Sequence, residues 1–425
     1  WLLTIILVLV CFLYLGYKGY QEWFKTRHPF WSGQPVAHYH RWDLYLQNSR
    51  YLDCRNRLEV KAPSDTRLIC LQEEIKSSGD WGHGWNTLLT DFLGNHFRNS
   101  QDYRDDYTLD QVQWWFGWSK NGWMHLKMGA NSYQPISLVL LEGEGVGVGV
   151  GGKIIGCIQG LPLAWGTRED QKLIYFVDLL CIHSEYRKKN LAPVLISSLA
   201  QRGIQLMGRD SAFLFKIEGK RLPFRETYSF QNYYLEVGEV NEGKGVNGGT
   251  VVDGVNGVNG VTVGEYGYRE INNNNNRHLK KAISLFLKDT DPEGVQWNSS
   301  YLELILNHPG IILLVLTKPS TDHSIIIQGV VLCRIQTSVV DKKKKKIIEL
   351  VQIIGDFDPD DFKDYLYQKD KSTDTWTIVF NLTSRDRMKT CLDYFKDAKT
   401  ESGISVYYYF YGKYQKPVKN LNLFL

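Results

Sequence analysis

The sequence predicts an α/β protein built from two similar halves and preceded by one apolar helix. In the first half, a strand at 172–183, a basic turn, a helix at 191–208 and a strand at 211–217 form a βαβ unit, which pairs its two strands in parallel. The second half repeats this order, from a helix at 277–289 to a final strand at 405–414. The first residues of the chain carry no charge, which predicts the preceding helix.

Length and composition are those of an ordinary globular protein. The 425 residues allow two or three domains or one fused pair, and 43% of them are hydrophobic and 23% charged. The net charge of +4 is small and does not indicate nucleic-acid binding, and no zinc-finger, homeodomain or RNA-binding signature is present. The seven cysteines lack CxxC spacing, which favours a reducing compartment over a disulfide framework and argues against a zinc site.

Residues 1–17 are predicted to cross a membrane as a helix. The stretch WLLTIILVLVCFLYLGY is uncharged and reaches the lower length limit for a span. Lys18, Lys25 and Arg27 follow it, so we expect the globular part on the cytosol-like, positive side of a membrane that the sequence does not identify. The alternatives are a signal peptide or a buried core helix, but no small-residue cleavage site and no polar face are found. Because the chain begins with Trp1 rather than Met, we expect a fragment or a processed form.

Two local signals lie between the apolar helix and the βαβ unit. The stretch 105–118 predicts a helix, since Thr108 can cap it and Gln111 follows at the capping-box position. The segment GEGVGVGVGG at 143–152 satisfies the pattern GxGxxG, but the residues after it, at 153–160, have the pattern of a strand rather than of a helix. We therefore interpret it as a hairpin connection and not as a phosphate-binding loop.

The second half contains two segments of biased composition. Residues 238–276 repeat Gly, Val and Asn and predict a low-complexity insertion. The run KKKKK at 342–346 predicts a solvated hairpin tip rather than a nucleic-acid patch. The other predicted elements of this half are strands at 311–317, 324–335, 347–355 and 376–382 and a helix at 385–398.

The segment with the strongest functional signal is FVDLLCIHSEYRKKNLAPVLISSLAQR, at 176–202. A strand ends within it, the cations Arg187, Lys188 and Lys189 turn the chain, and a helix begins near Leu191. Backbone N–H groups at a helix N-terminus beside cations form an anion site suited to a pyrophosphate. The alternative is a basic, solvent-exposed turn without a ligand.

Part of this segment, VDLLCIHSEYRKKNLAPVLI, resembles the signature of the N-myristoyltransferases, a family built from two fused acetyltransferase-like halves. Other motifs of that family are matched in order along the chain, and together they cover most of residues 28–425. These motifs are FWSGQPV (30–36), NGWMHLKM (121–128), KIIGCIQGLP (153–162), WTIVFNLTSRDRMKTCLDYFK (376–396) and SVYYYFYGKY with the terminal LNLFL (405–425).

The resemblance implies a fold of two fused acetyltransferase-like (GNAT-type) lobes. The chain would then consist of a transmembrane helix, an N-terminal lobe on the acyl-CoA side, a low-complexity insertion and a C-terminal lobe. The corresponding bounds are 1–17, 18–237, 238–276 and 277–425.

The resemblance also implies which residues carry the chemistry. The backbone N–H groups of Leu179 and Leu180 would hold the thioester carbonyl as an oxyanion hole. The α-carboxylate of Leu425 would be the base, and burial among apolar neighbours would raise its pKa. The substrate would be an acyl-CoA, myristoyl-CoA in the family, and no metal is implied. The coenzyme would contact His28, Phe30, Trp31, Arg187, Lys188, Lys189, Leu191 and Ala192.

The chain departs from the family pattern at four places. Asn190 stands where the basic turn usually ends in Arg, which removes a charge from the pyrophosphate site. Asp178 stands where the family has Asn before the oxyanion pair, and Phe230 stands where the family has a histidine. The acidic loop that receives the acceptor peptide is reduced to residues 91–106, which also fit a plain solvated loop. Its remaining acidic residues near the end are Asp102, Asp105 and Asp106.

The implied function is transfer of a long-chain acyl group from acyl-CoA to the amine of an N-terminal glycine, without a covalent enzyme intermediate. Two alternatives stay open because of the departures. The first is a structural subunit of a membrane assembly, which keeps the fold without catalysis and has the other subunits as partners. The second is an acyl-CoA or lipid-binding module without turnover. None of these functions includes a nucleic-acid partner.

Overall fold

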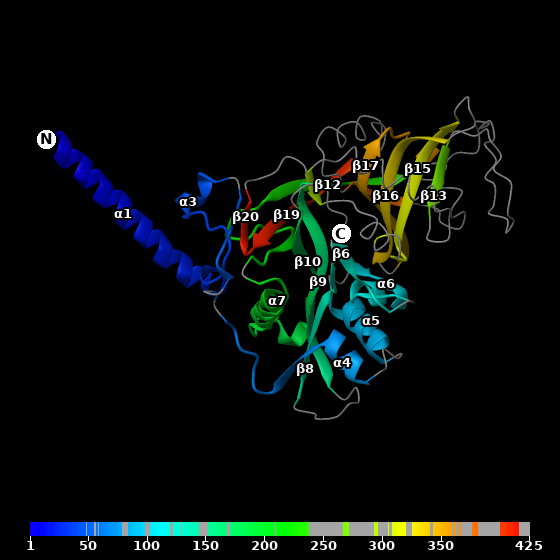
Figure 1. Cartoon of the computed structure of the whole chain (residues 1–425), viewed down its shortest axis with the longest axis horizontal. Coiled ribbons are helices and arrows are strands. Elements are labelled where there is room, and N and C mark those ends of the chain that lie inside the picture. Colours follow the sequence, from blue (N-terminus) through cyan, green and yellow to red (C-terminus); the bar gives the residue numbers. More distant parts are fainter. Residues whose placement is uncertain are drawn as a thin grey trace.

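The fold is seen in a computed structural model of the chain (Figure 1). It describes most of the N-terminal half and the strands of the C-terminal half. The described residues are 1–47, 49–54, 57, 59–78, 84–97, 103–119, 122–128, 130–143, 152–167, 171–208, 210–237, 267–271, 293–295, 305, 308–319, 325–340, 343–358, 361–362, 365–366, 376–380 and 400–415.

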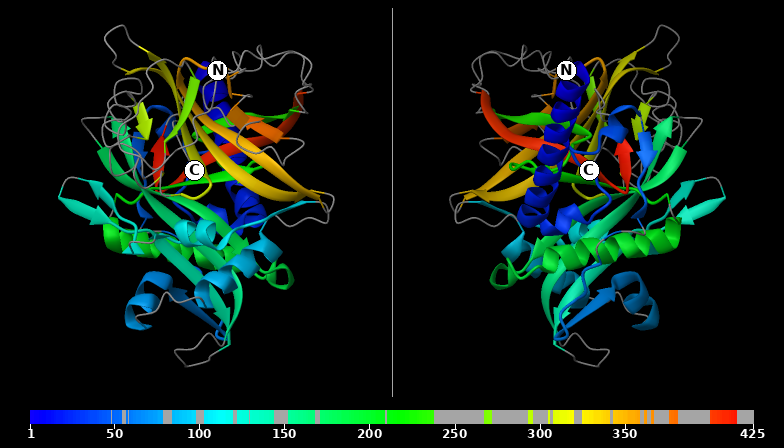
Figure 2. Two further views of the ribbon diagram at one scale, coloured as in Figure 1. Left: turned by 90° about the vertical axis from the view of Figure 1, so that its right-hand side faces the viewer. Right: turned by 90° about the vertical axis from the view of Figure 1, so that its left-hand side faces the viewer.

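One large sheet runs through the described globular part (Figures 1 and 2). Its main path has the order β13-β15-β16-β17-β18-β12-β19-β11-β10-β9-β8-β2, while β14 pairs with β9 and β3 with β16. The strands are β2 (Thr66–Cys70), β3 (Tyr103–Asp105), β8 (Ile136–Glu142), β9 (Lys153–Thr167), β10 (Gln171–Ile182), β11 (Phe213–Glu218), β12 (Tyr228–Val237), β13 (Gly267–Ile271), β14 (Glu293–Val295), β15 (Ile311–Pro319), β16 (Ile325–Val340), β17 (Lys343–Gly355), β18 (Trp376–Phe380) and β19 (Thr400–Tyr411).

Short ribbons and helices complete the described elements. The two-stranded ribbons are β1 (Ser49–Tyr51) with β20 (Lys413–Gln415), β4 (Trp118–Ser119) with β5 (Gly122–Trp123), and β6 (Leu126–Met128) with β7 (Asn131–Tyr133). The helices are α1 (Leu2–Arg27), α2 (Pro29–Ser32), α3 (Trp42–Tyr45), α4 (Leu71–Ser78), α5 (Gly84–His96), α6 (Leu109–Trp115), the 3-10 turn η2 (Ser184–Tyr186) and α7 (Leu191–Met207).

Exchanged strands join the two halves of the chain. The predicted βαβ unit is present, because β10, α7 and β11 follow one another and β10 pairs with β11 in parallel. A second parallel pair, β17 with β18, lies in the C-terminal half. Near the C-terminus, β19 pairs with β11 and with β12, and β12 in turn pairs with β18. Each half therefore contributes a strand that pairs with strands of the other half.

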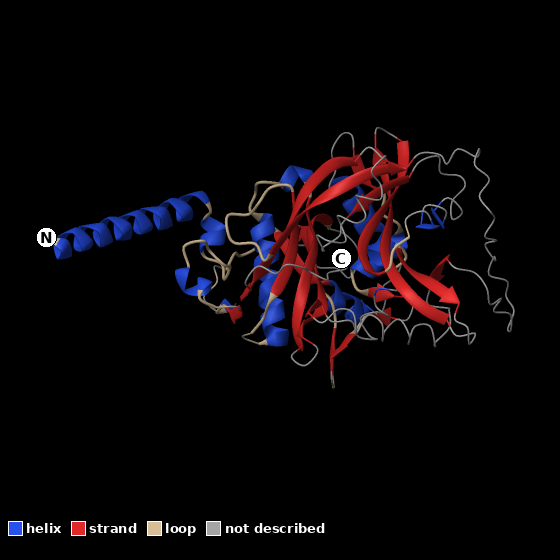
Figure 3. Cartoon of the chain, turned by 90° about the horizontal axis from the view of Figure 1, so that it is seen from above, coloured by secondary structure: helices blue, strands red, loops and turns tan. Residues whose placement is uncertain are grey.

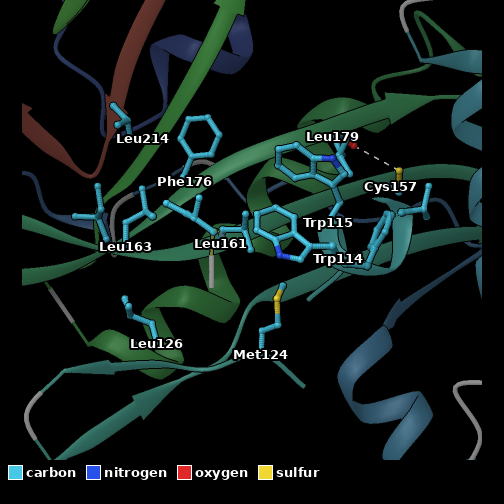
Figure 4. Packing of buried hydrophobic residues seen from close by; sticks show 14 of the residues in the cluster. Trp114, Trp115, Met124, Leu126, Cys157, Leu161, Leu163, Phe176, Leu179 and Leu214 are labelled. Atoms are coloured by element: carbon cyan, nitrogen blue, oxygen red, sulfur yellow. Dashed lines mark hydrogen bonds between the residues drawn. The ribbon is translucent and has the colours of Figure 1, made fainter. Parts of the chain in front are cut away.

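Helices cover both faces of the sheet around β9 and β10 (Figure 1). On one face α7 packs so closely that a Cβ added at Gly203 would lie 2.3 Å from Cζ of Phe213. On the other face, α5 and α6 enclose an apolar cluster that includes Trp114, Trp115 and Leu179 (Figure 4). The strands between these helices are therefore buried on both sides, which matches their nearly continuous apolar sequence.

Two local predictions from the sequence are confirmed. The capping box of α6 is present: Thr108 Oγ1 accepts from the backbone N–H of Gln111 at 3.2 Å, and Gln111 Oε1 accepts from the backbone N–H of Thr108 at 3.0 Å. The glycine-rich segment connects β8 to β9, which pair in antiparallel fashion up to Glu142 and Lys153. It is therefore a hairpin connection, as its sequence context predicts.

Two other local predictions are wrong. Lysines 343–346 belong to β17 and pair with residues 337–340 of β16, so these four lysines lie in a strand rather than at a hairpin tip, while Lys342 lies outside the described residues. The segment expected as an acidic loop is largely regular, because residues 91–96 end α5 and residues 103–105 form β3. The lysines and residues 103–105 both pair with β16, which the local composition does not reveal.

Several predicted features lie outside the described residues. They are the helices at 277–289 and 385–398, most of the insertion at 238–276, and the terminal Leu425.

The helix α1 projects away from the rest of the protein (Figures 1 and 3). Its 26 residues have a mean hydropathy of 2.1 over their most apolar stretch, none of which is buried. At 1.5 Å per residue the helix is roughly 39 Å long, so it is long and apolar enough to cross a membrane. The helix extends beyond the predicted 1–17, because its last part packs against the protein through the buried Phe24.

Deleting residues 1–17 is expected to leave a folded, soluble protein. None of these residues is buried, and Phe24 stays in the truncated chain. The truncated chain should remain in the supernatant after ultracentrifugation without detergent and should melt in one cooperative transition by circular dichroism. A truncated chain that aggregates, or that melts without a cooperative transition, would assign the segment to the protein core.

Candidate active site

The parallel strands β10 and β11 separate halfway along their length. Their pairing joins residues 175–177 to residues 213–215, although both strands continue beyond this point. At the same level, the pairing of β10 with β9 shifts between Asp178 and Cys181. A β-bulge of this kind takes residues of one strand out of the ladder. The residues concerned are Leu179 and Leu180, the predicted oxyanion donors.

Leu179 has a left-handed backbone, with φ of +50°. For a residue other than glycine this conformation costs about 1–2 kcal/mol, so the surroundings must hold it. The side chain is buried in the cluster with Trp115 (Figure 4), and the carbonyl oxygen accepts a hydrogen bond from Cys157 Sγ at 3.4 Å. The Leu179 N–H donates to Oδ1 of Asp178 at 2.7 Å. One predicted oxyanion donor is therefore already engaged by a carboxylate of the chain itself.

A cavity of about 990 Å³ opens where β10 and β11 separate. Ligand sites in proteins typically measure about 300–1,000 Å³, so this cavity is at the upper end of that range. Along β11 successive side chains point to opposite faces, and both faces contribute to the lining. The residues toward α7 are apolar and include Val177, Leu180, Ile196, Leu199, Phe213 and Phe215. The residues on the other side include the apolar Ile347 and Val379 and a polar group, which consists of Lys216, Glu218, Arg334, Gln336 and Glu349.

Ion pairs line the polar side of this cavity. Arg334 and Glu349 are cross-strand neighbours on β16 and β17, and Arg334 donates from Nε to Oε2 of Glu349 at 2.7 Å. Nζ of Lys216 lies 3.3 Å from Oε1 of Glu218. Burial alone would raise the pKa of Glu349, but the Arg334 guanidinium and the Lys216 ammonium outweigh it and hold this pKa below its usual value. The polar side therefore presents ionised groups at neutral pH.

The basic turn lies where β10 meets α7. Arg187 lines the cavity, and its guanidinium donates to the backbone carbonyls of His96 at 2.6 Å and Ile182 at 3.3 Å. Lys188 and Asn190 have left-handed backbones, with φ of +67° and +60°. In a turn that contains left-handed residues, successive backbone N–H groups can point toward one side and form a concavity for an anion.

The start of α7 is open to such an anion. Asn190, at the N-cap, makes no side-chain capping bond to the first turn of the helix. Leu191 is buried and Ala192 lines the cavity, while the side chains of Lys188 and Lys189 are exposed. Nζ of Lys189 lies 4.3 Å from the ring centroid of Tyr186, so this lysine leans over the turn.

The N-terminal aromatic residues reach the same cavity through Trp31. Its ring stacks on Phe215 with 6.1 Å between centroids and 10° between planes, and it lines the cavity. Phe30 packs edge-on against Trp31 at 4.8 Å, whereas His28 contacts Phe24 at the end of α1. The cavity thus brings together Trp31, Leu180, Arg187 and Ala192, while Phe30 lies one contact away and His28 packs against Phe24 instead.

This geometry can be compared with known proteins. Residues 142–212, which contain β9, β10, the basic turn and α7, match the family model of Myristoyl-CoA:protein N-myristoyltransferase, N-terminal domain. Over these residues the chain is similar to the N-myristoyltransferases. The matched segment includes both the bulge and the start of α7, which border the cavity described above.

Solved N-myristoyltransferase structures share the fold over nearly the whole chain. A crystal structure of Saccharomyces cerevisiae N-myristoyltransferase with bound myristoyl-CoA covers 95% of this chain and 94% of that chain, with 15% sequence identity and a TM-score of 0.61. A second, with bound myristoyl-CoA and inhibitors, covers the same shares with 16% identity and a TM-score of 0.63. At such identities the likeness shows the fold alone, and the predicted two-lobed fold is confirmed. No curated protein matches the chain in sequence.

The polar side of the cavity was not predicted from the sequence. The signal was present, because Lys216, Glu218, Arg334 and Glu349 are charges within otherwise apolar strands. Such charges are rarely buried unless they are paired. What the sequence could not supply was that the two ion pairs line one cavity, since Lys216 and Arg334 lie on strands from different halves of the chain.

Proposed function

We propose that this protein binds a long-chain acyl-CoA and transfers its acyl group to the amine of an N-terminal glycine. The observation that carries the proposal is the large cavity at the separation of β10 and β11, bordered by the bulge, the basic turn and the start of α7. The relatives of known structure hold myristoyl-CoA, which supports an acyl-CoA as the donor.

The two ends of the acyl-CoA would lie in different environments. The pyrophosphate would contact Lys188, Lys189 and the backbone N–H groups of Leu191 and Ala192, because the first turn of α7 has no side-chain cap. Trp31 and Arg187 would contact the coenzyme along the cavity. The acyl chain would lie on the apolar side, where its burial removes hydrocarbon from water.

The reacting thioester would lie at the bulge. The acceptor nitrogen attacks the thioester carbonyl carbon, a C–N bond forms and the C–S bond breaks. The attacking nitrogen loses a proton, the departing sulfur gains one, and coenzyme A leaves as the thiol. The N–H groups of Leu179 and Leu180 would stabilise the oxyanion, a contribution of a few kcal/mol. The α-carboxylate of Leu425 would first remove a proton from the acceptor ammonium, so that the nitrogen has a free electron pair.

Asp178 would control one of the two oxyanion donors. Its carboxylate accepts from the Leu179 N–H, so this bond has to break before Leu179 can serve the thioester. An acceptor arriving as an ammonium offers Asp178 a charge-assisted hydrogen bond in exchange. Acceptor binding would thereby release the donor, and bound acyl-CoA would be protected from hydrolysis until an acceptor is present.

The same hydrogen bond also supports a second candidate function, acyl-CoA binding without turnover. If the hydrogen bond from the Leu179 N–H to Asp178 persists during the reaction, the oxyanion lacks one donor and is repelled by the Asp178 carboxylate. Turnover with a peptide that carries a free N-terminal glycine distinguishes the transferase from this alternative. Acyl-CoA binding distinguishes both from a structural subunit that keeps only the fold.

Changing Lys188 and Lys189 together to alanine is expected to weaken acyl-CoA binding by about 2–4 kcal/mol, at about 1–2 kcal/mol for each charge-assisted contact. Isothermal titration with myristoyl-CoA measures the change. A matched control changes Lys127 and Lys172 to alanine, since both are exposed and lie on β6 and at the start of β10, away from the turn. Equal affinity in the two double variants would exclude this turn as the pyrophosphate site.

A further inference from the structure

The short helix α3 exposes a group of large apolar side chains. Trp42 is 70% exposed, Tyr45 is 40% exposed, and Leu46, which follows the helix, is 91% exposed. The rings of Trp42 and Tyr45 stack with 5.7 Å between their centroids, and the helix is anchored through the buried Leu44. These three exposed residues are named the α3 patch. Such a patch indicates contact with another apolar medium.

The α3 patch lies at the level where the apolar part of α1 ends. His40, two residues before Trp42, contacts the rings of Tyr17 and Tyr20 at centroid distances of 6.1 and 6.0 Å. Residue 17 is the last uncharged position of the apolar stretch, and Lys18 follows it. Figure 1 shows α3 beside α1 on the same side of the protein. If α1 crosses a bilayer, α3 lies at the boundary between its hydrocarbon and its headgroups.

The charges around the α3 patch suit an anionic surface. The guanidinium carbon of Arg225 lies 3.9 Å from the ring centroid of Tyr45, and Arg41 and Arg50 both pair with Asp43. Basic residues exceed acidic ones at the end of α1 as well. The basic residues of this region are Lys18, Lys25, Arg27, Arg41, Arg50 and Arg225, and the acidic ones are Glu22, Asp43 and Glu226.

We propose that the α3 patch inserts into the headgroup region of the membrane that α1 crosses, with anionic phospholipid as its partner. Trp and Tyr are enriched at this depth of a bilayer, because their rings are apolar and their N–H and O–H groups stay hydrated. Nearby Lys and Arg are attracted to anionic headgroups. Three side chains form too small a patch for a stable protein interface. The inference rests on α1 crossing a membrane and is independent of acyl transfer.

Two membrane contacts have a consequence that one helix alone does not have. A single span leaves the protein free to rotate about the helix axis and to tilt, together with the helix, relative to the bilayer. A second contact at α3, which belongs to the segment that packs on α1 through His40, fixes the face that the protein turns to the membrane. The entrance of the acyl-CoA cavity would then keep one orientation relative to the lipid surface.

Quenching by brominated lipid tests this contact in the full chain. The protein is reconstituted into vesicles of phosphatidylcholine and phosphatidylserine, with bromine placed high in the acyl chains. The emission of Trp42 is obtained by subtracting the fluorescence spectrum of the Trp42→Phe variant from that of the parent protein. In vesicles without bromine we expect the Trp42 emission to be shifted to shorter wavelength. In vesicles with brominated lipid we expect it to be quenched, and quenched less when the lipid is phosphatidylcholine alone.

The matched control is Trp85→Phe, because Trp85 is half-buried on α5, which lies away from α1 (Figure 1). Its difference spectrum should be unaffected by bromine. Protection of Cys11 from a water-soluble maleimide in the same vesicles verifies the span, because Cys11 is exposed on α1. Unquenched Trp42 emission with Cys11 protected would overturn the proposal, and so would cross-linking of position 46 to a second copy. Modification of Cys11 would overturn the span and the proposal together.

Discussion

Replacing Asp178 with alanine is expected to raise the hydrolysis of bound acyl-CoA, measured without an acceptor, by about tenfold to a hundredfold. In the parent protein the Leu179 N–H donates to the Asp178 carboxylate at 2.7 Å, and a bond of this type contributes about 1.5–3 kcal/mol. The substitution frees this donor for the thioester carbonyl, whose oxygen becomes negative as water attacks. It also removes a charge that repels the oxyanion. Release of the coenzyme A thiol from myristoyl-CoA measures the rate.

The matched control for this experiment is Asp178→Asn. Its amide oxygen still accepts from the Leu179 N–H, so hydrolysis should stay near the parent rate. The acceptor ammonium, however, loses a charged partner, and KM for a peptide with a free N-terminal glycine should rise about tenfold. The thermal midpoint of each variant shows whether the bulge persists without the carboxylate. If the alanine variant binds myristoyl-CoA as the parent does and hydrolyses it no faster, Asp178 does not control the donor.

Adding residues after Leu425 is expected to abolish acyl transfer while leaving acyl-CoA binding nearly unchanged. The α-carboxylate proposed as the base would no longer be terminal, and the additional chain would have to occupy the place where base, acceptor and thioester converge. Amidation of the terminus removes the charge at almost constant shape and should have the same effect on transfer. Turnover with a glycine peptide and titration with myristoyl-CoA measure the two quantities separately.

The control for the extended chain is the same peptide added before Trp1. Trp1 is fully exposed at the far end of α1, so this extension should leave transfer at the parent rate (Figure 1). Transfer at the parent rate with the extension after Leu425 would remove the α-carboxylate from the mechanism. Such a result would not bear on acyl-CoA binding in the cavity, which the variant of Lys188 and Lys189 tests independently.

The elements nearest the cavity were predictable because their signals are local. The helix α7 has apolar residues at helical spacing, and α6 begins at a capping box whose two hydrogen bonds involve residues three apart. The apolar stretch that begins α1 needs no partner to be recognised. The basic turn between β10 and α7 was likewise visible as three adjacent cations in a βαβ unit.

Other features depend on partners far away in the chain. The lysine run becomes part of β17 because β16 pairs with it, and nothing within the run indicates this. Strand β19, near the C-terminus, pairs with β11 and with β12 of the first half, and most of the second half of the chain lies between these strands in the sequence. The pairing of Arg334 with Glu349 follows from the register of β16 and β17, which a bulge shifts by one residue between Leu332 and Cys333.

By itself, then, the sequence determined the βαβ unit, the apolar helix, the resemblance to the N-myristoyltransferases and the segment in which the chemistry is expected. Each of these is a pattern of neighbouring residues, and neighbours are given by the order of the chain. Only the tertiary structure decided that Leu179 turns into a left-handed bulge, that its N–H meets Asp178, and that a cavity opens to ion pairs from the other half. The bulge costs about 1–2 kcal/mol locally and persists because burial of Leu179 and its hydrogen bonds offset that cost. Strain of this kind has no local signature, since the contacts that sustain it come from other strands and helices.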